Sequence, residues 1–374
     1  MKTGIVDLPL HYGTTPRWLF ERMVNLSKEI ARVIIYEFGK DELLRRLSNP
    51  FWFQGFACVI GFDWHSSGTT TVACGALKQA LDSEEFGVKI LGGKGSASKK
   101  VPDNIINVAN NYNFSDKKIS ELIKASKLSA KIDNACLQDG FQLYHHVIVI
   151  TEEGNWSVIQ QGMNPENKLA RRYHWLGENI KNFVEDAEKQ EIISDIKVKP
   201  LNLIAKESSE TRKCSVDIVK ERNFKNLFTN LFSEQKTLYY VEKFTMPRHH
   251  EIYLENYKNL MNSEKILKNL EEAYQRQPKD YEELISIKGI GAESLRALAL
   301  ICDLIYNVKP SWEDPVKYSF AHGGKDGYPY KVNKKYMDKS IEILRTAVEN
   351  AKINNKEKLN AIRRLYEFLP EEYR

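Results

Sequence analysis

The sequence predicts an α+β protein, in which an N-terminal mixed α/β domain is followed by a mostly helical domain. Two segments, Phe141–Thr151 and Trp156–Gln161, are short and rich in β-branched and aromatic residues, as strands are, and helical periodicity surrounds them. After residue 246 the pattern is almost entirely helical. A polar stretch near 186–222 separates the two patterns. We therefore expect an α+β catalytic domain over 1–185, a connecting segment over 186–245 and a helical domain over 246–374.

The N-terminal elements follow from periodicity and from end signals. Pro16–Phe38 places apolar residues at helical spacing, and Thr69–Leu81 and Ser115–Ala130 do the same, the last after a serine cap. The two predicted strands are joined by Glu152–Asn155, a turn sequence that contains a glycine. We expect these strands to form an antiparallel hairpin. On such a strand, His145 and His146 would face opposite sides of the sheet.

The C-terminal half predicts helices in close succession. They are expected at His250–Leu260, Ser263–Arg276, Tyr281–Ser286, Ala292–Tyr306, Val332–Ala351 and Lys356–Phe368.

Composition excludes several classes of protein. The 374 residues carry 55 basic and 50 acidic side chains, for a formal charge of +5. The charge is evenly spread, because residues 1–185 and 246–374 each hold 22 basic and 20 acidic residues. The five cysteines form no CxxC pair, and no apolar run of about 18 residues is present. We expect a cytoplasmic protein without a disulfide framework or a membrane span, in which any phosphate binding depends on local geometry.

The segment Asp280–Tyr306 has the most specific pattern. A capping signal at Asp280 and Glu283 begins a short helix, the pattern breaks at Lys288-Gly289-Ile290-Gly291, and a stronger helix follows. Two helices joined in this way resemble the helix-hairpin-helix of DNA-repair and recombination proteins. Glycines allow a tight turn close to a ligand, and the free N–H groups of the second helix suit a phosphate oxygen. The alternative is an ordinary helical hairpin in which the glycines serve the turn.

A second resemblance concerns the residues after this hairpin. In helix-hairpin-helix DNA glycosylases an essential aspartate follows at about the distance of Asp314, which here precedes Pro315. Glu293 stands where bifunctional members place a lysine, so the resemblance implies a monofunctional glycosylase that needs no cofactor. The alternative role for Asp314 is a helix cap. Lys325, in the glycine-rich loop His322–Gly327, is a further candidate for contact with a phosphate or a flipped base, and the alternative is a surface turn.

The N-terminal half holds clusters of polar residues that suit a metal-dependent nuclease. Oxygen and imidazole ligands of Mg²⁺ or Mn²⁺ and a base to orient water are what such an enzyme requires. Candidate metal ligands are Asp63, His65 and Asp139, and the further acid–base candidates are Lys131, Asp133 and His145. The alternatives are a capping loop at Gly61–Thr71 and a solvated hairpin.

Basic residues near these clusters are candidates for nucleic-acid contact. Arg171 and Arg172 lie beside Tyr173 and Trp175, which suits phosphate binding combined with stacking. Lys94 lies in the segment Gly92-Gly93-Lys94-Gly95, which predicts a basic loop but does not match a P-loop. This loop could contact phosphates, and the alternative is a flexible hairpin.

The whole chain also resembles an uncharacterised archaeal and bacterial family of unknown function. The matching stretches are DLPLHYG, LSNPFWFQGF, GFDWHSSGTTT, GGKG, QDGFQLYHH, QQGM, ARRYHW and SFAHGGKDG. This resemblance implies that the polar stretches form one functional unit, and it brings no activity.

Three functions are therefore open at this point. The first is a DNA-processing or repair enzyme, a metal-dependent nuclease anchored by Lys288–Gly291. The second is a monofunctional DNA glycosylase that uses Asp314, and the third is a non-catalytic DNA-binding module. The partner is expected to be DNA, and RNA is not excluded by contacts to a phosphate backbone. Protein partners are not indicated.

Overall fold

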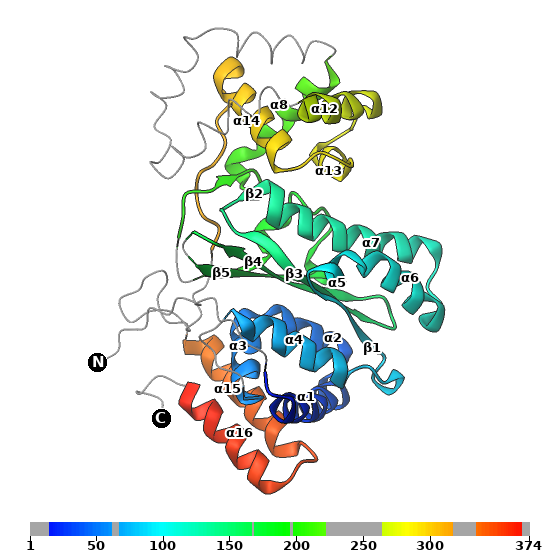
Figure 1. Ribbon diagram of the computed structural model, residues 1–374, viewed down its shortest axis with the longest axis vertical. Coiled ribbons are helices and arrows are strands. Elements are labelled where there is room, and N and C mark those ends of the chain that lie inside the picture. The colour runs from blue at the N-terminus through cyan, green and yellow to red at the C-terminus, as the bar shows by residue number, and fades with distance from the viewer. Residues whose placement is uncertain are drawn as a thin grey trace, which may run out of the picture.

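A five-stranded antiparallel sheet lies between two layers of helices (Figure 1). The computed structural model describes residues 15–61, 67–166, 168–194, 197–221, 264–316 and 334–368. The predicted mixture of helices and an antiparallel sheet is confirmed. The helix expected at 250–260 and the candidates Asp63, His65 and Lys325 lie outside the described residues.

The sheet has the strand order β1-β3-β4-β5-β6. Its strands are β1 (Val88–Lys94), β3 (Gln142–Thr151), β4 (Trp156–Asn164), β5 (Leu169–Leu176) and β6 (Glu191–Ile193). A separate pair joins β2 (Leu137–Gln138) to β7 (Leu201–Asn202). The predicted hairpin is confirmed as β3 and β4, and Gly154 takes a φ of 80° in its turn. The other strands of the sheet were not predicted.

The segment Gly92–Gly95 is not the basic loop that the sequence predicted. β1 continues through Lys94, and Gly92 pairs with Val147 of β3. Gly92 has a φ of 101°, which favours glycine, and a Cβ there would lie 2.9 Å from Val101 Cγ2 and would overlap the carbonyl oxygen of His146. This glycine is required because a neighbouring strand lies too close for a side chain.

One face of the sheet packs against helices from both ends of the chain. These are α1 (Arg17–Phe38), α2 (Lys40–Ser48), α3 (Pro50–Val59), α4 (Gly68–Ala80), α15 (Lys334–Asn350) and α16 (Asn355–Phe368). Their apolar residues share one core with Val147, Val149 and Ile159 of the sheet. α3 begins at Asn49, whose Oδ1 accepts hydrogen bonds from the N–H groups of Phe51 and Trp52, both at 3.0 Å.

A second group of helices lies on the opposite side of the sheet, shown above it in Figure 1; the first three of them along the chain contact the strands, and the others pack further out, against these and against one another. They are α5 (Ser96–Lys99), α6 (Val101–Tyr112), α7 (Asp116–Lys131), α8 (Ser209–Lys220), α12 (Glu264–Arg276), α13 (Tyr281–Ser286) and α14 (Ala292–Tyr306). A π-helical turn, Ile132–Cys136, extends α7, and short 3₁₀ turns lie at Glu84–Phe86, Gly177–Asn179, Ala187–Lys189 and Lys206–Ser208. Ile148, Ile150 and Val158 of the sheet enter this core.

The helices after residue 246 divide between the two cores. α12, α13 and α14 pack beside α8 and α7, whereas α15 and α16 pack against α1 and α3. The sequence did not predict this division, because periodicity shows which face of a helix is apolar and not which partner covers it. Among the described residues, no helix is both long and apolar enough to cross a bilayer.

Candidate functional site

Three neighbouring strands each carry two consecutive buried polar residues. They are His145-His146 on β3, Gln160-Gln161 on β4 and Arg171-Arg172 on β5. The register aligns His145 with Gln161 and Gln161 with Arg172, and it aligns His146 with Gln160. Because side chains alternate along a strand, each pair sends one residue to each face of the sheet. The opposite orientation predicted for His145 and His146 is consistent with this register.

On the face covered by α4, a row of polar side chains runs across four strands. Lys94, at the edge, pairs with His145, which pairs with Gln161, which pairs with Arg172. The amide of Gln161 bridges to α4: its Nε2 donates to the carbonyl oxygen of Ser67 at 2.7 Å, and its Oε1 accepts from the Thr70 hydroxyl. The first turn of α4 is thereby fixed over the row.

Arg172 lies fully buried in this row. Its guanidinium donates to His174 Nε2 at 2.9 Å, to Gln54 Oε1 at 3.1 Å and to Thr70 Oγ1 at 3.3 Å. Burial lowers the pKa of Arg172 to about 9. A guanidinium held inside the fold is not available to a phosphate at the surface, so the position of Arg172 does not favour the predicted nucleic-acid contact.

Arg171 lies on the other face and belongs to a buried ion-pair cluster. Its Nη1 lies 2.9 Å from Asp139 Oδ2, and its Nη2 lies 2.8 Å from Asp314 Oδ2. Tyr173 donates to the same Asp139 oxygen at 2.7 Å. Burial alone would lower the pKa of Arg171, but the charges of Asp139 and Asp314 raise it above the ordinary value. Because Arg171 is also fully buried, its position does not favour the predicted contact with nucleic acid.

Both carboxylates of this cluster are engaged in structural contacts. Asp314 also accepts the N–H groups of Val198 at 2.7 Å and Val316 at 3.1 Å, and its side chain is 2% exposed. Asp139 accepts the N–H of Phe141 at 3.0 Å, and burial raises its pKa against the opposing charge of Arg171. Among the described residues, no group of three or more His, Cys, Asp or Glu side chains could hold a metal ion. The described contacts therefore do not favour a metal site at Asp139 or base excision by Asp314.

Asp133 lies on this face too, and it ends a chain of hydrogen bonds. Gln160 Nε2 donates to Asp133 Oδ2 at 2.5 Å, and Trp175 Nε1 donates to the same oxygen at 2.9 Å. Burial raises the pKa of Asp133 well above its ordinary value. Gln160 Oε1 lies 2.9 Å from His146 Nδ1, and His146 Nε2 lies 2.8 Å from the Ser126 hydroxyl. The sequence pointed to Asp133 and missed Gln160 and Ser126.

Lys131 and the turn between α13 and α14 lie in contact. The Lys131 ammonium donates to the carbonyl oxygen of Ile290, and burial lowers the pKa of Lys131. Two neighbouring carbonyl oxygens also accept side-chain hydrogen bonds. Asn269 Nδ2 donates to the carbonyl oxygen of Gly289 at 2.9 Å, and Gln138 Nε2 donates to that of Ala292, the first residue of α14, at 2.9 Å. The predicted catalytic lysine thus supports the turn.

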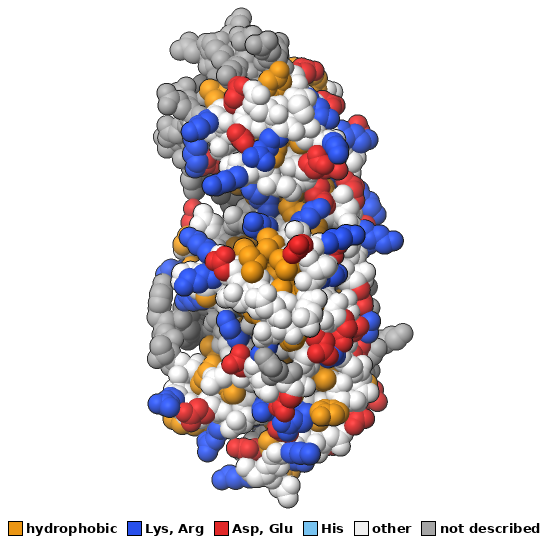
Figure 2. Space-filling view, turned by 90° about the vertical axis from the view of Figure 1, so that its right-hand side faces the viewer, with side chains coloured by type: hydrophobic (Ala, Val, Ile, Leu, Met, Phe, Trp, Pro, Cys, Tyr) orange, Lys and Arg blue, Asp and Glu red, His pale blue; other side chains and the backbone are white. Residues whose placement is uncertain are grey.

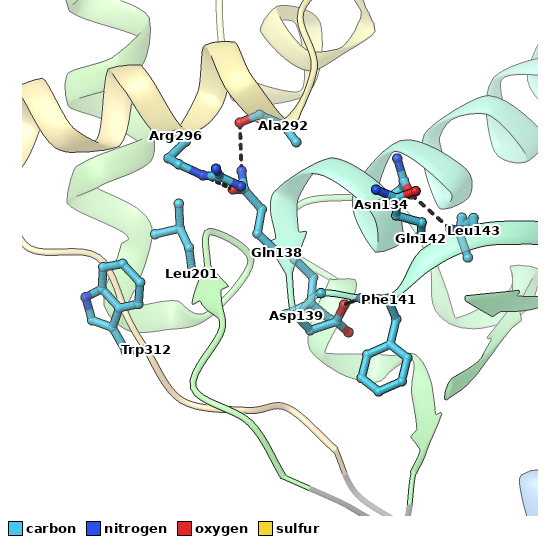
Figure 3. A pocket seen from close by; sticks show the side chains of 12 residues that line it. Asn134, Gln138, Asp139, Phe141, Gln142, Leu143, Leu201, Ala292, Arg296 and Trp312 are labelled. Atoms are coloured by element: carbon cyan, nitrogen blue, oxygen red, sulfur yellow. Dashed lines mark hydrogen bonds between the residues drawn. The ribbon is translucent and has the colours of Figure 1, made fainter. Parts of the chain in front are cut away.

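A cavity of about 490 Å³ lies under the N-terminus of α14. Figure 3 shows Gln138 reaching from β2 to Ala292 and Arg296 of α14, and Arg296 Nε donates to Gln138 Oε1 at 2.7 Å. Asn134, Gln142 and Trp312 line the same cavity. It is open to solvent and polar, and it adjoins the turn.

Acid sensitivity of the fold should come in part from His145. Burial lowers the pKa of His145 to about 3, and among the described residues neither ring nitrogen has a hydrogen-bond partner. Because the folded pKa is below the unfolded value of 6.5, the neutral ring contributes stability above pH 6.5, and this contribution is lost as pH falls toward 3. Burial has the same effect on His146, with a pKa of about 4, whereas the raised pKa values of Asp133 and Asp139 act in the opposite direction.

His145→Leu therefore should stabilise the protein in acid but not at neutral pH. We expect a gain of about 2 kcal/mol in unfolding free energy at pH 4.5 relative to the wild type, and little change at pH 7.5. Urea denaturation at the two pH values measures this difference. An equal effect at both would show that protonation of His145 does not oppose folding.

These features define an α+β protein in which helices cover both faces of an antiparallel sheet and buried polar residues gather near one end of its strands. The chain belongs to the family described as protein of unknown function DUF763, whose family model matches residues 4–332. No curated protein matches the chain, and no solved structure matches it. The resemblance to an uncharacterised family is thereby confirmed, and the fold carries no activity over from known proteins.

Proposed function

We propose that this protein binds nucleic acid, with α13, the turn at Ile287–Gly291 and the start of α14 acting as a helix-hairpin-helix that holds a backbone phosphate. The observation that carries the proposal is the arrangement of donors and acceptors in the turn. The carbonyl oxygens of Gly289 and Ile290 in the turn, and that of Ala292 at the start of α14, accept hydrogen bonds from the side chains of Asn269, Lys131 and Gln138 respectively. At the start of α14 the N-cap residue is Gly291, which has no side chain to cap the first N–H groups, and the described part of the chain shows no side-chain cap there.

A turn of this kind offers a ligand the N–H donors at the start of α14 and few carbonyl acceptors, because side chains already bind those carbonyl oxygens. The first N–H groups of a helix need partners, and the helix dipole favours an anion there. Lys288 and Gly289, at the tip, are exposed, whereas Ile290 is buried and anchors the turn in the core. Gly289 has a φ of 96°, which the tight turn requires. Glu293, also exposed, would weaken the attraction for an anion, and Lys288 offsets it.

The charge distribution supports a local contact with nucleic acid and not attraction by an extended basic surface. Figure 2 shows basic and acidic side chains interspersed over the face in view, and the two sequence halves are equally balanced. Binding through backbone amides and a few cations should fall only gradually with salt concentration. Such contacts position a nucleic-acid strand without reading its sequence. DNA processing stays a proposal built on this contact, with Lys94, exposed at the end of β1, as a further cation.

The substitution Gly291→Asp should weaken nucleic-acid binding without destabilising the fold. Gly291 has a φ of −133° and open space around its Cα, so a side chain is sterically accepted. An aspartate there should cap α14 and add about 0.5–1 kcal/mol of stability. It would occupy the same N–H groups and repel a phosphate, so affinity for labelled single-stranded DNA, duplex DNA or RNA should fall about tenfold or more.

Asn354→Asp is the matched control. Asn354 is exposed and accepts the N–H of Glu357 at the start of α16, at the other end of the molecule (Figure 1). It adds the same charge at the same type of helix position, and affinity should stay within about twofold. Fluorescence anisotropy of both variants, with melting temperatures, tests the proposal. Equal affinities for Gly291→Asp and the wild type would reject the turn as the anchor.

A further inference from the structure

A second cavity contains a serine and a histidine in hydrogen-bond contact. It has a volume of about 400 Å³ and lies between α5, α6, α7 and the start of β3. Ser126 and His146 both line it, and each is almost fully buried. The other lining residues include the apolar Pro102, Ala130 and Leu143 and two exposed cations, Lys99 and Lys127. This size is within the range of cavities that hold small molecules.

The hydrogen bonds around His146 have a single consistent direction. Asp133 is an acceptor toward Gln160, so the Gln160 NH₂ group faces Asp133 and its carbonyl oxygen faces His146. His146 Nδ1 must then carry the proton that Gln160 Oε1 accepts. His146 Nε2 is left as an acceptor, and at 2.8 Å it accepts the Ser126 hydroxyl proton.

We propose that Ser126 is a nucleophile with His146 as its general base, in a site that hydrolyses a small carboxylic ester bearing an anionic group. A nucleophile beside a base that a third group orients is the arrangement that covalent catalysis requires. Gln160 and Asp133 are positioning residues, because they act through His146. Lys99 and Lys127 supply the positive charge that favours an anionic substrate.

The reaction is balanced without a further reagent. Ser126 Oγ attacks the ester carbonyl carbon, and its proton passes to His146 Nε2. The C–O bond to the alcohol then breaks, and that proton goes to the leaving alkoxide. Water attacks the acyl-serine and gives a proton to His146, which returns it to Ser126 as the acid leaves. The sum is ester plus water giving acid plus alcohol.

The groups around His146 determine the pH range of this chemistry. They are Ser126 and Lys127 from α7, Lys99 from α5, and Gln160 from β4 with Asp133 behind it; His145, the preceding residue of β3, points to the opposite face of the sheet but also lines the cavity. Burial lowers the pKa of His146 to about 4, so its ring is neutral from about pH 5 upward. Gln160→Glu would place an anion against Nδ1 and should move the acid limit of reactivity to higher pH.

Labelling with a fluorophosphonate probe tests the site on the full-length protein. Mass spectrometry should find the label on Ser126, and Ser126→Ala should abolish it. Ser129→Ala is the matched control, since Ser129 lies one turn further along α7, is fully buried, and donates to the Ser126 carbonyl oxygen at 3.2 Å. It should label as the wild type does.

Two further variants test the base. His146→Gln should slow labelling by about 100-fold or more, with far-UV circular dichroism unchanged. Gln160→Glu should keep labelling at pH 8 and lose it at a higher pH than the wild type does. An unlabelled wild type, or equal labelling of Ser126→Ala, would overturn the proposal. Neither result bears on nucleic-acid binding, which depends on a different turn.

Discussion

Replacing Asp314 by alanine should lower the free energy of unfolding by about 3–5 kcal/mol, because it leaves a buried charge half paired. Asp314 contacts Arg171 through both of its oxygens, at 3.1 and 2.8 Å. It also accepts the N–H groups of Val198 and Val316. In the alanine variant several buried donors lose their hydrogen-bond acceptor at once, and each unsatisfied group costs about 1–3 kcal/mol.

Glu313→Ala is the matched control for this variant. Glu313 is the neighbouring residue and carries the same charge, but its side chain is exposed. Removing it should therefore change the unfolding free energy by about 0.5 kcal/mol or less. Urea denaturation of both variants gives the comparison. Asp314→Asn keeps the size of the side chain and loses its charge, and it should also destabilise the protein. Wild-type stability in Asp314→Asn would favour the glycosylase prediction, in which the carboxylate is needed for chemistry.

Local elements could be predicted from the sequence where a periodic pattern coincided with an end signal. The helices Tyr281–Ser286 and Ala292–Tyr306 have the predicted bounds, and Asp280 caps the first by accepting the N–H of Glu283 at 2.8 Å. The β3–β4 hairpin is likewise a local feature. Its apolar runs and its glycine-containing turn lie next to each other in the sequence, so no distant contact is needed to identify it.

Burial and long-range pairing could not be predicted in the same way. Arg171 and Arg172 suggested a nucleic-acid contact because they lie beside Tyr173 and Trp175, a combination that suits phosphate binding with stacking. Their burial depends on Asp139, Asp314 and Gln54, which are distant in the sequence and which only the tertiary fold brings near. The consecutive pairs Gln160-Gln161 and Arg171-Arg172 were the available signal, since two polar residues within a strand must serve both faces of a sheet.

Gly92→Ala should be the second strongly destabilising change, with a loss of about 3–5 kcal/mol in unfolding free energy. The φ of 101° disfavours a side chain, and a Cβ would overlap the His146 carbonyl oxygen of the paired strand. This oxygen belongs to the backbone of β3, so it cannot move away from the added Cβ as the end of a flexible side chain could. Relief would require β1 and β3 to separate in the centre of the fold.

Gly75→Ala provides the opposite outcome as a control. Gly75 lies within α4, and a methyl group there would meet the Phe20 ring at an ordinary contact distance of 3.8 Å. Alanine favours the helix, so unfolding free energy should rise by about 0.5–1 kcal/mol. Denaturation midpoints in urea measure both changes. If Gly92→Ala keeps wild-type stability and instead loses affinity for nucleic acid, Gly92–Gly95 is a phosphate-binding loop and the strand contacts are not what require glycine.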